Sequence, residues 1–256
     1  MFTTDERTRL RRHLVARAEA DPQVLAAAVV GSAARDREDR WSDIDLAFSV
    51  GPGRRPEDVA DDWTGHLYAD HHAVAHVDVW SGAALYRVFL LQNTLQVDLS
   101  FWPAEAFSPV GGPFRLLFGD AGPAVPATPR DTGALLGTTW LYALHARSSI
   151  ARGRALQALH MLNGMRDQLV VLACVRAGLP ADQGRGVDDL PADLRRRLTS
   201  TVARRLDAPE LTRSFRELAD LLVEEAAIAD PGAAAVLAPV VTEMVRSAED
   251  EPTEEG

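Results

Sequence analysis

The chain has 256 residues, of which 46% are hydrophobic and 25% charged, and its formal net charge is -10. This composition predicts a folded protein with one large domain or two modest ones. The acidic balance argues against a surface that coats nucleic acid, which requires a basic face, and favours a cationic small molecule as partner. The charged first residues, MFTTDERTRLRRH, and the lack of a long apolar run predict a cytoplasmic protein without a membrane partner.

The first half of the chain mixes helical and strand-like patterns. In chain order we expect a helix at 5–20, strands at 25–30 and 44–50, a helix from Pro56 to about Tyr68, and strand-like stretches HAVAHVDVW, ALYRVFLLQ and TLQVDLSFW. The pair Asp21-Pro22 ends the first helix, because the residue before a proline avoids the helical conformation. A short polar turn at Gln92-Asn93 joins the last two stretches into a predicted hairpin.

The second half is predicted to be helical. From about Pro103 to Pro129 the chain is rich in proline and glycine, as a hinge between domains often is. Helical patterns follow at 131–151, 153–178, 190–206, 208–229 and 232–248. We therefore predict an α+β fold with three parts: a mixed sheet flanked by helices at 1–125, a helical bundle at 126–248, and a disordered acidic tail at 249–256.

The segment GSAARDREDRWSDIDL ends in two aspartates, Asp43 and Asp45, at the start of a predicted strand. Residues i and i+2 of a strand project to the same face, so the two carboxylates point together while Ile44 and Leu46 are buried on the other side. Carboxylates this close repel each other unless a cation or proton lies between them. Mg²⁺, which prefers oxygen ligands and phosphate-bearing substrates, suits that position.

The other end of the segment, Gly31-Ser32, directly follows an apolar strand. If a helix begins near Ser32, the free backbone amides of its first turn would form an anion site, and Gly31 would let a phosphate approach the backbone. The hydroxyl of Ser32 adds a donor. Ser42, just before Asp43, has two open interpretations: it donates to a phosphate, or it caps the turn.

A metal site for phosphoryl chemistry usually needs a third carboxylate, because two metal ions are held near the attacking and leaving oxygens. The predicted strands offer Asp78 and Asp98, and we favour Asp98 because Val97, Leu99 and Phe101 give its strand a clear apolar opposite face. A further carboxylate, Asp167, lies on a mostly apolar predicted helix. It either orients or deprotonates a substrate, or it forms a salt bridge with Arg166 or Arg147.

These residues carry a resemblance to a known family. Gly31-Ser32, ten further residues and then Asp43-x-Asp45 between apolar strands resemble the signature of the nucleotidyltransferase superfamily, which includes DNA polymerase beta and the antibiotic nucleotidyltransferases. The stretch YRVFLLQNTLQVDLSFWPAEAF with RLLFGD beyond it is similar to aminoglycoside 6-adenylyltransferases. The chain departs from many relatives in having Asp36, where they have glycine, after Arg35.

The resemblance implies a function for each end of the motif. Asp43, Asp45 and Asp98 would hold Mg²⁺, with Asp98 either a ligand or the base for the attacking hydroxyl, and Gly31 and Ser32 would bind the nucleotide phosphates. The implied reaction transfers AMP from ATP to a hydroxyl of a small, cationic, aminoglycoside-like molecule, with two Mg²⁺ ions. Two alternatives stay open: an antitoxin-type adenylyltransferase that modifies a protein, and a regulator that binds nucleotide without turnover.

Overall fold

The computed structural model describes residues 1–249. Of the predicted tail 249–256, residues 250–256 lie outside the described residues, and Glu249 ends the last helix. The described residues divide into two compact units, Met1–Thr128 and a second unit that begins at Pro129. None of the helices in the described part is long and apolar enough to cross a membrane.

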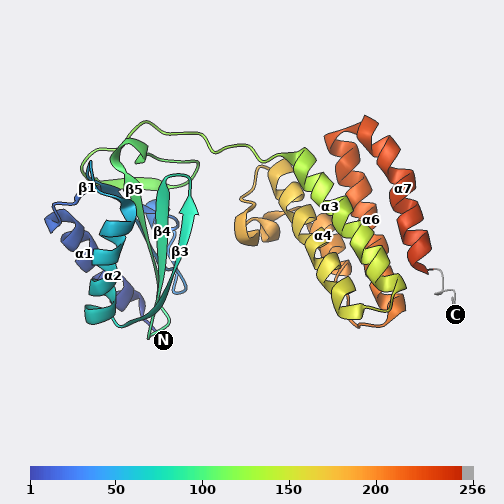
Figure 1. Cartoon of the computed structure of the whole chain (residues 1–256), viewed down its shortest axis with the longest axis horizontal. Helices are drawn as coiled ribbons and strands as arrows, with labels where there is room; N and C mark the ends of the chain where they lie inside the picture. The colour runs from blue at the N-terminus through green and yellow to red at the C-terminus, as the bar shows by residue number, and fades with distance from the viewer. Residues whose placement is uncertain (250–256) are drawn as a thin grey trace. The chain divides into compact units, whose positions relative to one another are not determined.

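The first unit contains a six-stranded mixed sheet and two long helices (Figure 1). Its elements are α1 (Thr4–Ala20), β1 (Val24–Val30), the 3-10 turn η1 (Ala33–Arg35), β2 (Ile44–Val50), α2 (Pro56–Asp70), β3 (Ala73–Ser81), β4 (Ala84–Leu91), β5 (Gln96–Pro103), the 3-10 turn η2 (Ala104–Ala106) and β6 (Phe114–Phe118). The strand order is β3-β4-β5-β2-β1-β6. Only β2 and β5 run parallel, and the predicted β4-β5 hairpin is present.

One face of the sheet packs against α1 and α2. The apolar residues of β2, among them Ile44, Leu46 and Phe48, meet Leu14 of α1 and Trp63 of α2 in a single core. Because side chains alternate along a strand, the residues between them project from the opposite face. We call this opposite side the open face. It carries a small apolar cluster of alanines and Phe107, and it also carries Asp45.

β6 is a strand that the sequence did not predict. We expected 103–129 to be an irregular hinge, but Phe114–Phe118 pairs antiparallel with β1. Its central residues are exposed, so burial imposes no alternation of apolar and polar residues on its sequence. The glycines and prolines on both sides suggest a loop. Hydrogen bonding to β1, which is distant in sequence, makes this segment a strand.

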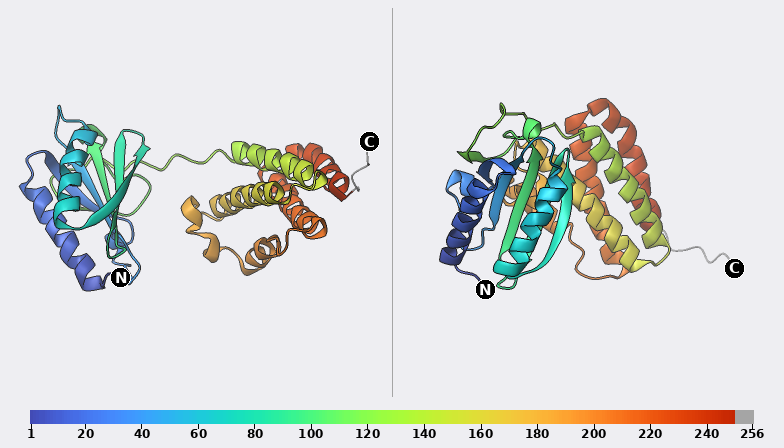
Figure 2. Two further views of the ribbon diagram at one scale, coloured as in Figure 1. Left: turned by 60° about the horizontal axis from the view of Figure 1, so that its bottom comes forward. Right: turned by 60° about the vertical axis from the view of Figure 1, so that its left-hand side comes forward.

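The second unit is helical, as predicted. It contains α3 (Thr132–Ala151), α4 (Ala155–Arg176), the 3-10 turns η3 (Asp182–Gly184) and η4 (Val187–Asp189), α5 (Ala192–Ser200), α6 (Ala208–Ala229) and α7 (Pro231–Glu249). Figure 2 shows the four long helices as a bundle, in which α3 packs on α4 and α7, and α6 packs on the same two. The core between them includes Leu162, Met165, Phe215 and Leu222, and the single cysteine, Cys174, is buried in it.

The helix predicted over 190–206 is shorter than expected and ends at Ser200. The backbone carbonyls that follow accept hydrogen bonds from arginines of neighbouring helices. Arg166 donates to the carbonyl of Thr201, and Arg213 donates to those of Ser200 and Val202. These arginine side chains satisfy the carbonyl oxygens at the end of α5, which have no partner within the helix. The chain can therefore leave the helix at this point.

Candidate active site

Asp43 and Asp45 lie at the start of β2. Asp43 directly precedes the strand and Asp45 is its second residue, and both are half-buried. Ile44 and Leu46, on the other side of the strand, are fully buried under the helices. Alternation along the strand thus places the two carboxylates together on the open face.

The parallel pairing of β2 and β5 brings in Asp98. In this register Asp45 lies directly opposite Asp98. One carboxylate oxygen from each of Asp43, Asp45 and Asp98 can be chosen so that all three lie within 4.8 Å of one another. We call these three residues the carboxylate cluster. Among the described residues it is the one group of three or more acidic, histidine or cysteine side chains close enough to hold a metal ion.

The donor set of the carboxylate cluster fits Mg²⁺. All three groups offer oxygen, the ligand that Mg²⁺ prefers, and in octahedral coordination oxygens on opposite sides of the ion are about 4.2 Å apart. Adjacent ligand oxygens of such an ion are about 3.0 Å apart, so the three oxygens, which lie within 4.8 Å of one another, would close toward a bound ion. Three half-buried carboxylates also leave part of the coordination sphere to water or to a phosphate.

Gln96 belongs to the site although the sequence analysis did not select it. Its side-chain amide donates to both carboxylate oxygens of Asp98, at 2.9 and 3.1 Å, and to Asp43 at 3.5 Å. Gln96 precedes Asp98 by two residues on β5, so it shares the face of that aspartate. The same alternation used for Asp43 and Asp45 could therefore have identified it.

Gly31, the residue that follows β1, lies against the carboxylate cluster. Its backbone is in the left-handed region, with φ of +65°, and a Cβ at this position would lie 2.2 Å from an oxygen of Asp45. No real Cβ tolerates that approach, so the glycine makes room for the carboxylate. This role is additional to the phosphate contact predicted for Gly31, which stays a prediction.

The helix expected near Ser32 is a single 3-10 turn, η1. It ends at Arg35, and the next residue, Asp36, takes the left-handed conformation with φ of +53° and so stops the turn. A turn this short does not supply the aligned amides and dipole of an α-helix, so that part of the expectation is wrong. The contact predicted between Ser32 and a phosphate now depends on its own amide and hydroxyl. Ser32 is half-buried.

Asp36 is the position at which the sequence differs from the family motif that it resembles. A left-handed backbone favours glycine, and aspartate is among the few other residues that tolerate it. Arg115 of β6 donates to the Asp36 carboxylate at 2.8 Å and to the carbonyl of Ala33 at 2.9 Å. The loop between β1 and β2, which contains Asp36, is thus fixed to the edge strand β6. The sequence did not predict this strand.

The far end of this loop is fixed to α1. Arg7, which is buried, donates to the carbonyls of Asp39 and Ser42 at 2.5 and 3.0 Å. The hydroxyl of Ser42 accepts from the Asp39 amide and donates to its carboxylate, which is the turn-capping alternative of the two. Hydrogen bonds from the Trp41 amide and the Ser42 hydroxyl lower the pKa of Asp39. A phosphate contact from Ser42 stays a prediction.

No protein-family model and no curated protein matches the sequence. Among solved structures, the chain is similar to an aminoglycoside 6-adenyltransferase from Bacillus subtilis, at 13% identity and a TM-score of 0.40, over 95% of this chain and 99% of that one. It is also similar to a nucleotidyltransferase-like protein from Exiguobacterium sibiricum, at 14% identity and a TM-score of 0.38, over 86% and 75% of the two chains. At these scores the likeness does not by itself assign a function.

Asp78, the rival to Asp98, lies apart from the carboxylate cluster. Arg87 of β4 donates to both of its carboxylate oxygens at 2.7 Å and also binds Asp61 and Thr64. These hydrogen bonds lower the pKa of Asp78. The Arg87 side chain is buried, so Asp78 neutralises a charge beneath α2.

Asp167 is exposed on α4 of the helical unit. Its neighbour Arg166 donates to Thr201 and to Asn163. Burial lowers the pKa of Arg166. A contact between Asp167 and a substrate stays a prediction.

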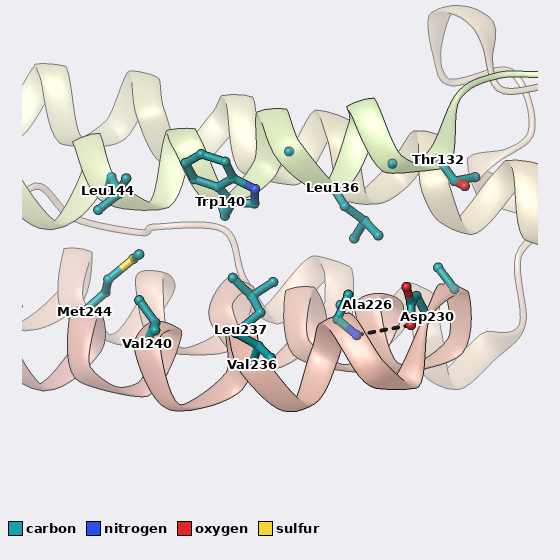
Figure 3. Close-up of a pocket in the computed structure, with 14 residues that line it drawn as sticks. Thr132, Leu136, Trp140, Leu144, Ala226, Asp230, Val236, Leu237, Val240 and Met244 are labelled. Carbon is teal, nitrogen blue, oxygen red and sulfur yellow. Dashed lines mark hydrogen bonds between the residues drawn. The ribbon is translucent and has the colours of Figure 1, made fainter.

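The helical unit has a cavity of its own, of about 780 Å³ between α3 and α7 (Figure 3). Leu136 and Trp140 project into it from α3, and Leu237 and Met244 from α7. Among the described residues that line it, Asp230 is the one carboxylate, and its Oδ1 accepts from the amides that begin α7. The cavity is an apolar environment and offers no set of metal ligands.

Proposed function

We propose that this protein is a Mg²⁺-dependent nucleotidyltransferase that transfers AMP from ATP to a hydroxyl group of a small, cationic, aminoglycoside-like molecule. The observation that carries the proposal is the carboxylate cluster, with its oxygens within 4.8 Å, beside the left-handed Gly31. Phosphoryl-type transfer depends on positioning and charge neutralisation more than on a special nucleophile. Carboxylates that hold divalent ions next to a tight glycine turn meet that need.

Asp43, Asp45 and Asp98 would hold the Mg²⁺ ions, which neutralise negative charge on the phosphates when they are bound. The chain's own residues have distinct tasks in the reaction. Gly31 and Ser32 bind phosphate oxygens and place the α-phosphorus near Asp98. The acceptor hydroxyl loses its proton to a carboxylate oxygen of Asp98 as its oxygen bonds to the α-phosphorus. The bond to the β-phosphate oxygen breaks, and pyrophosphate leaves.

We infer a cationic acceptor from the negative charge of the chain. A formal net charge of -10 attracts a polyamine-like molecule and disfavours nucleic acid. The resemblance of residues 86–107 to aminoglycoside 6-adenylyltransferases points to the same class. Binding of such an acceptor should therefore weaken as salt concentration rises, because screening weakens long-range attraction.

A pyrophosphate-release screen tests the proposal directly. Each of the four ribonucleoside triphosphates is combined with a panel of aminoglycosides and other hydroxylated antibiotics in the presence of Mg²⁺. We expect release with ATP and an aminoglycoside, a mass increase of one AMP on the drug, and no release from Asp43→Asn. Transfer of AMP to a co-expressed protein would instead favour the antitoxin-type alternative, and nucleotide binding with no transfer to any acceptor would favour the regulator.

Metal binding is measured separately from turnover. Mg²⁺ at about a hundred times its dissociation constant stabilises a folded protein by about 2.7 kcal/mol. We expect Mg²⁺ to raise the unfolding temperature of the wild type and to leave that of Asp43→Asn nearly unchanged. Equal stabilisation of both proteins would show that the carboxylate cluster is not the metal site.

A further inference from the structure

β3 is an edge strand of unusual exposure. Of its nine residues only Ala73 is buried, and β4 is its single neighbour within the described part of the chain (Figure 1). Its outer row of backbone N–H and C=O groups therefore faces no other strand there. Natural edge strands are usually protected from pairing by lysine, proline or short length. β3 has no lysine or proline, and its one register shift lies at its start, between Ala73 and Ala75.

The edge is also apolar on both faces. Val74, Val77, Val79 and Trp80 are each at least half exposed. Val77 and Val79 share one face of the sheet, and Trp80 lies on the other. Isolated exposed apolar residues are common, but four on one unpaired edge are typical of an interaction surface. The one carboxylate of the strand, Asp78, is held by two hydrogen bonds from Arg87 of β4, and its side chain is still 36% exposed.

The sequence of β3 is complementary to itself in the antiparallel direction. Val77 is the middle residue of Ala73–Ser81, so pairing about Val77 uses the whole strand. That register places His76 opposite Asp78 of a second copy. It also places Val74 opposite Trp80 and Ala75 opposite Val79. A register centred on Asp78 would put two carboxylates directly opposite each other, which is destabilising, and one centred on His76 would leave Trp80 outside.

We propose that β3 is a homodimer interface, in which two copies of this chain pair their β3 strands antiparallel about Val77. The two six-stranded sheets then form one continuous sheet across a two-fold axis. Such an interface is self-complementary, with each His76 facing the other copy's Asp78, and it satisfies the outer backbone groups of both edges. The proposal is independent of the nucleotidyltransferase reaction and is tested without nucleotide.

Cysteine cross-linking tests both the interface and its register. In the proposed pairing the two Val77 Cα atoms lie about 4.5–5.5 Å apart, within the range that a disulfide spans. Val77→Cys is therefore expected to form a covalent dimer under mild oxidation. The native Cys174 is buried and does not interfere.

Val79→Cys is the matched control on the same strand and face. Its two copies would be separated by four residue steps along the strand, about 13 Å, which is too far for a disulfide. We expect it to stay uncross-linked while still sedimenting as a dimer. A lack of cross-linking at Val77, or equal cross-linking at both positions, would overturn the proposed pairing.

Sedimentation of the wild type over a wide dilution series measures the association itself. We expect a monomer–dimer equilibrium, and Val77→Lys should weaken it at least about tenfold because two like charges then face each other. Leu156→Lys, at an exposed apolar position on α4, should leave it unchanged. Thermal unfolding checks that both variants are folded. A wild type that is monomeric throughout, or a Val77→Lys variant that dimerises normally, would overturn the proposal.

Discussion

Asp78 and the carboxylate cluster lie on opposite faces of the same sheet and are held in different ways. On the helix-covered side, Asp78 forms a bidentate pair with the buried Arg87. On the open face, Asp43, Asp45 and Asp98 lie next to one another, and Asp43 and Asp98 accept from the neutral amide of Gln96. A carboxylate paired with a buried arginine stabilises the fold, whereas carboxylates gathered together create a place for a cation.

The largest effect that we predict is the loss of activity in Asp45→Asn. Removing one carboxylate from the cluster should slow pyrophosphate release by about 10³-fold, or about 4 kcal/mol of activation free energy. Thermal unfolding without metal checks that the variant is folded. The control is Asp78→Asn, assayed at a temperature where it is folded, and it should retain activity. Normal turnover in Asp45→Asn would show that the carboxylate cluster, like Asp78, is not needed for the reaction.

The next effect concerns the glycine that makes room for the carboxylate cluster. Gly31→Ala should lower the free energy of unfolding by about 3 kcal/mol, from left-handed strain and from displacement of Asp45. Gly53→Ala isolates the first contribution, since Gly53 also has positive φ but a Cβ there would meet nothing within 4 Å. Urea unfolding of both variants measures the difference. Equal losses would mean that Asp45 moves aside without cost.

A smaller effect is expected for the paired carboxylate of the helix-covered side. Asp78→Asn should cost about 2 kcal/mol of stability at neutral pH, because it leaves Arg87 partly unsatisfied, and the 36% exposure of the Asp78 side chain limits the loss.

This stability difference should depend on pH. Hydrogen bonds from Arg87 hold the pKa of Asp78 below its ordinary value of 3.8. The stabilisation is therefore present above that value and is lost as the pH falls through the lowered pKa. Denaturant unfolding of the wild type and Asp78→Asn should accordingly converge in strong acid. A difference that does not depend on pH would show that packing, rather than charge, holds Asp78.

The smallest effect is expected at the loop. Asp36→Asn removes the ion pair with Arg115 but keeps a residue that tolerates the left-handed backbone, so it should cost less than about 1 kcal/mol. Asp36→Ala loses both features and should cost more. Denaturant midpoints of the two variants measure this order, and the reverse order would show that the conformation of Asp36 does not matter.

Much of the helical half could be predicted from sequence, because its apolar spacing is regular and proline or glycine marks its breaks. The helix over 208–229 has the predicted limits, with Asp207 as its capping residue. The end of α5 could not be predicted in this way. Its carbonyls are capped by Arg166 and Arg213 from other helices, and local sequence contains no record of such contacts.

The sequence alone determined that Asp43 and Asp45 share one face of a strand, because alternation is a local property of extended backbone. It also selected Asp98 by the apolar residues on either side of it. Only the tertiary structure decided that β5 runs parallel to β2 with Asp98 opposite Asp45. It likewise decided that the oxygens of the cluster meet within 4.8 Å, and that Arg115 of β6 holds the loop. These relations join segments far apart in the chain, so packing and strand pairing set them.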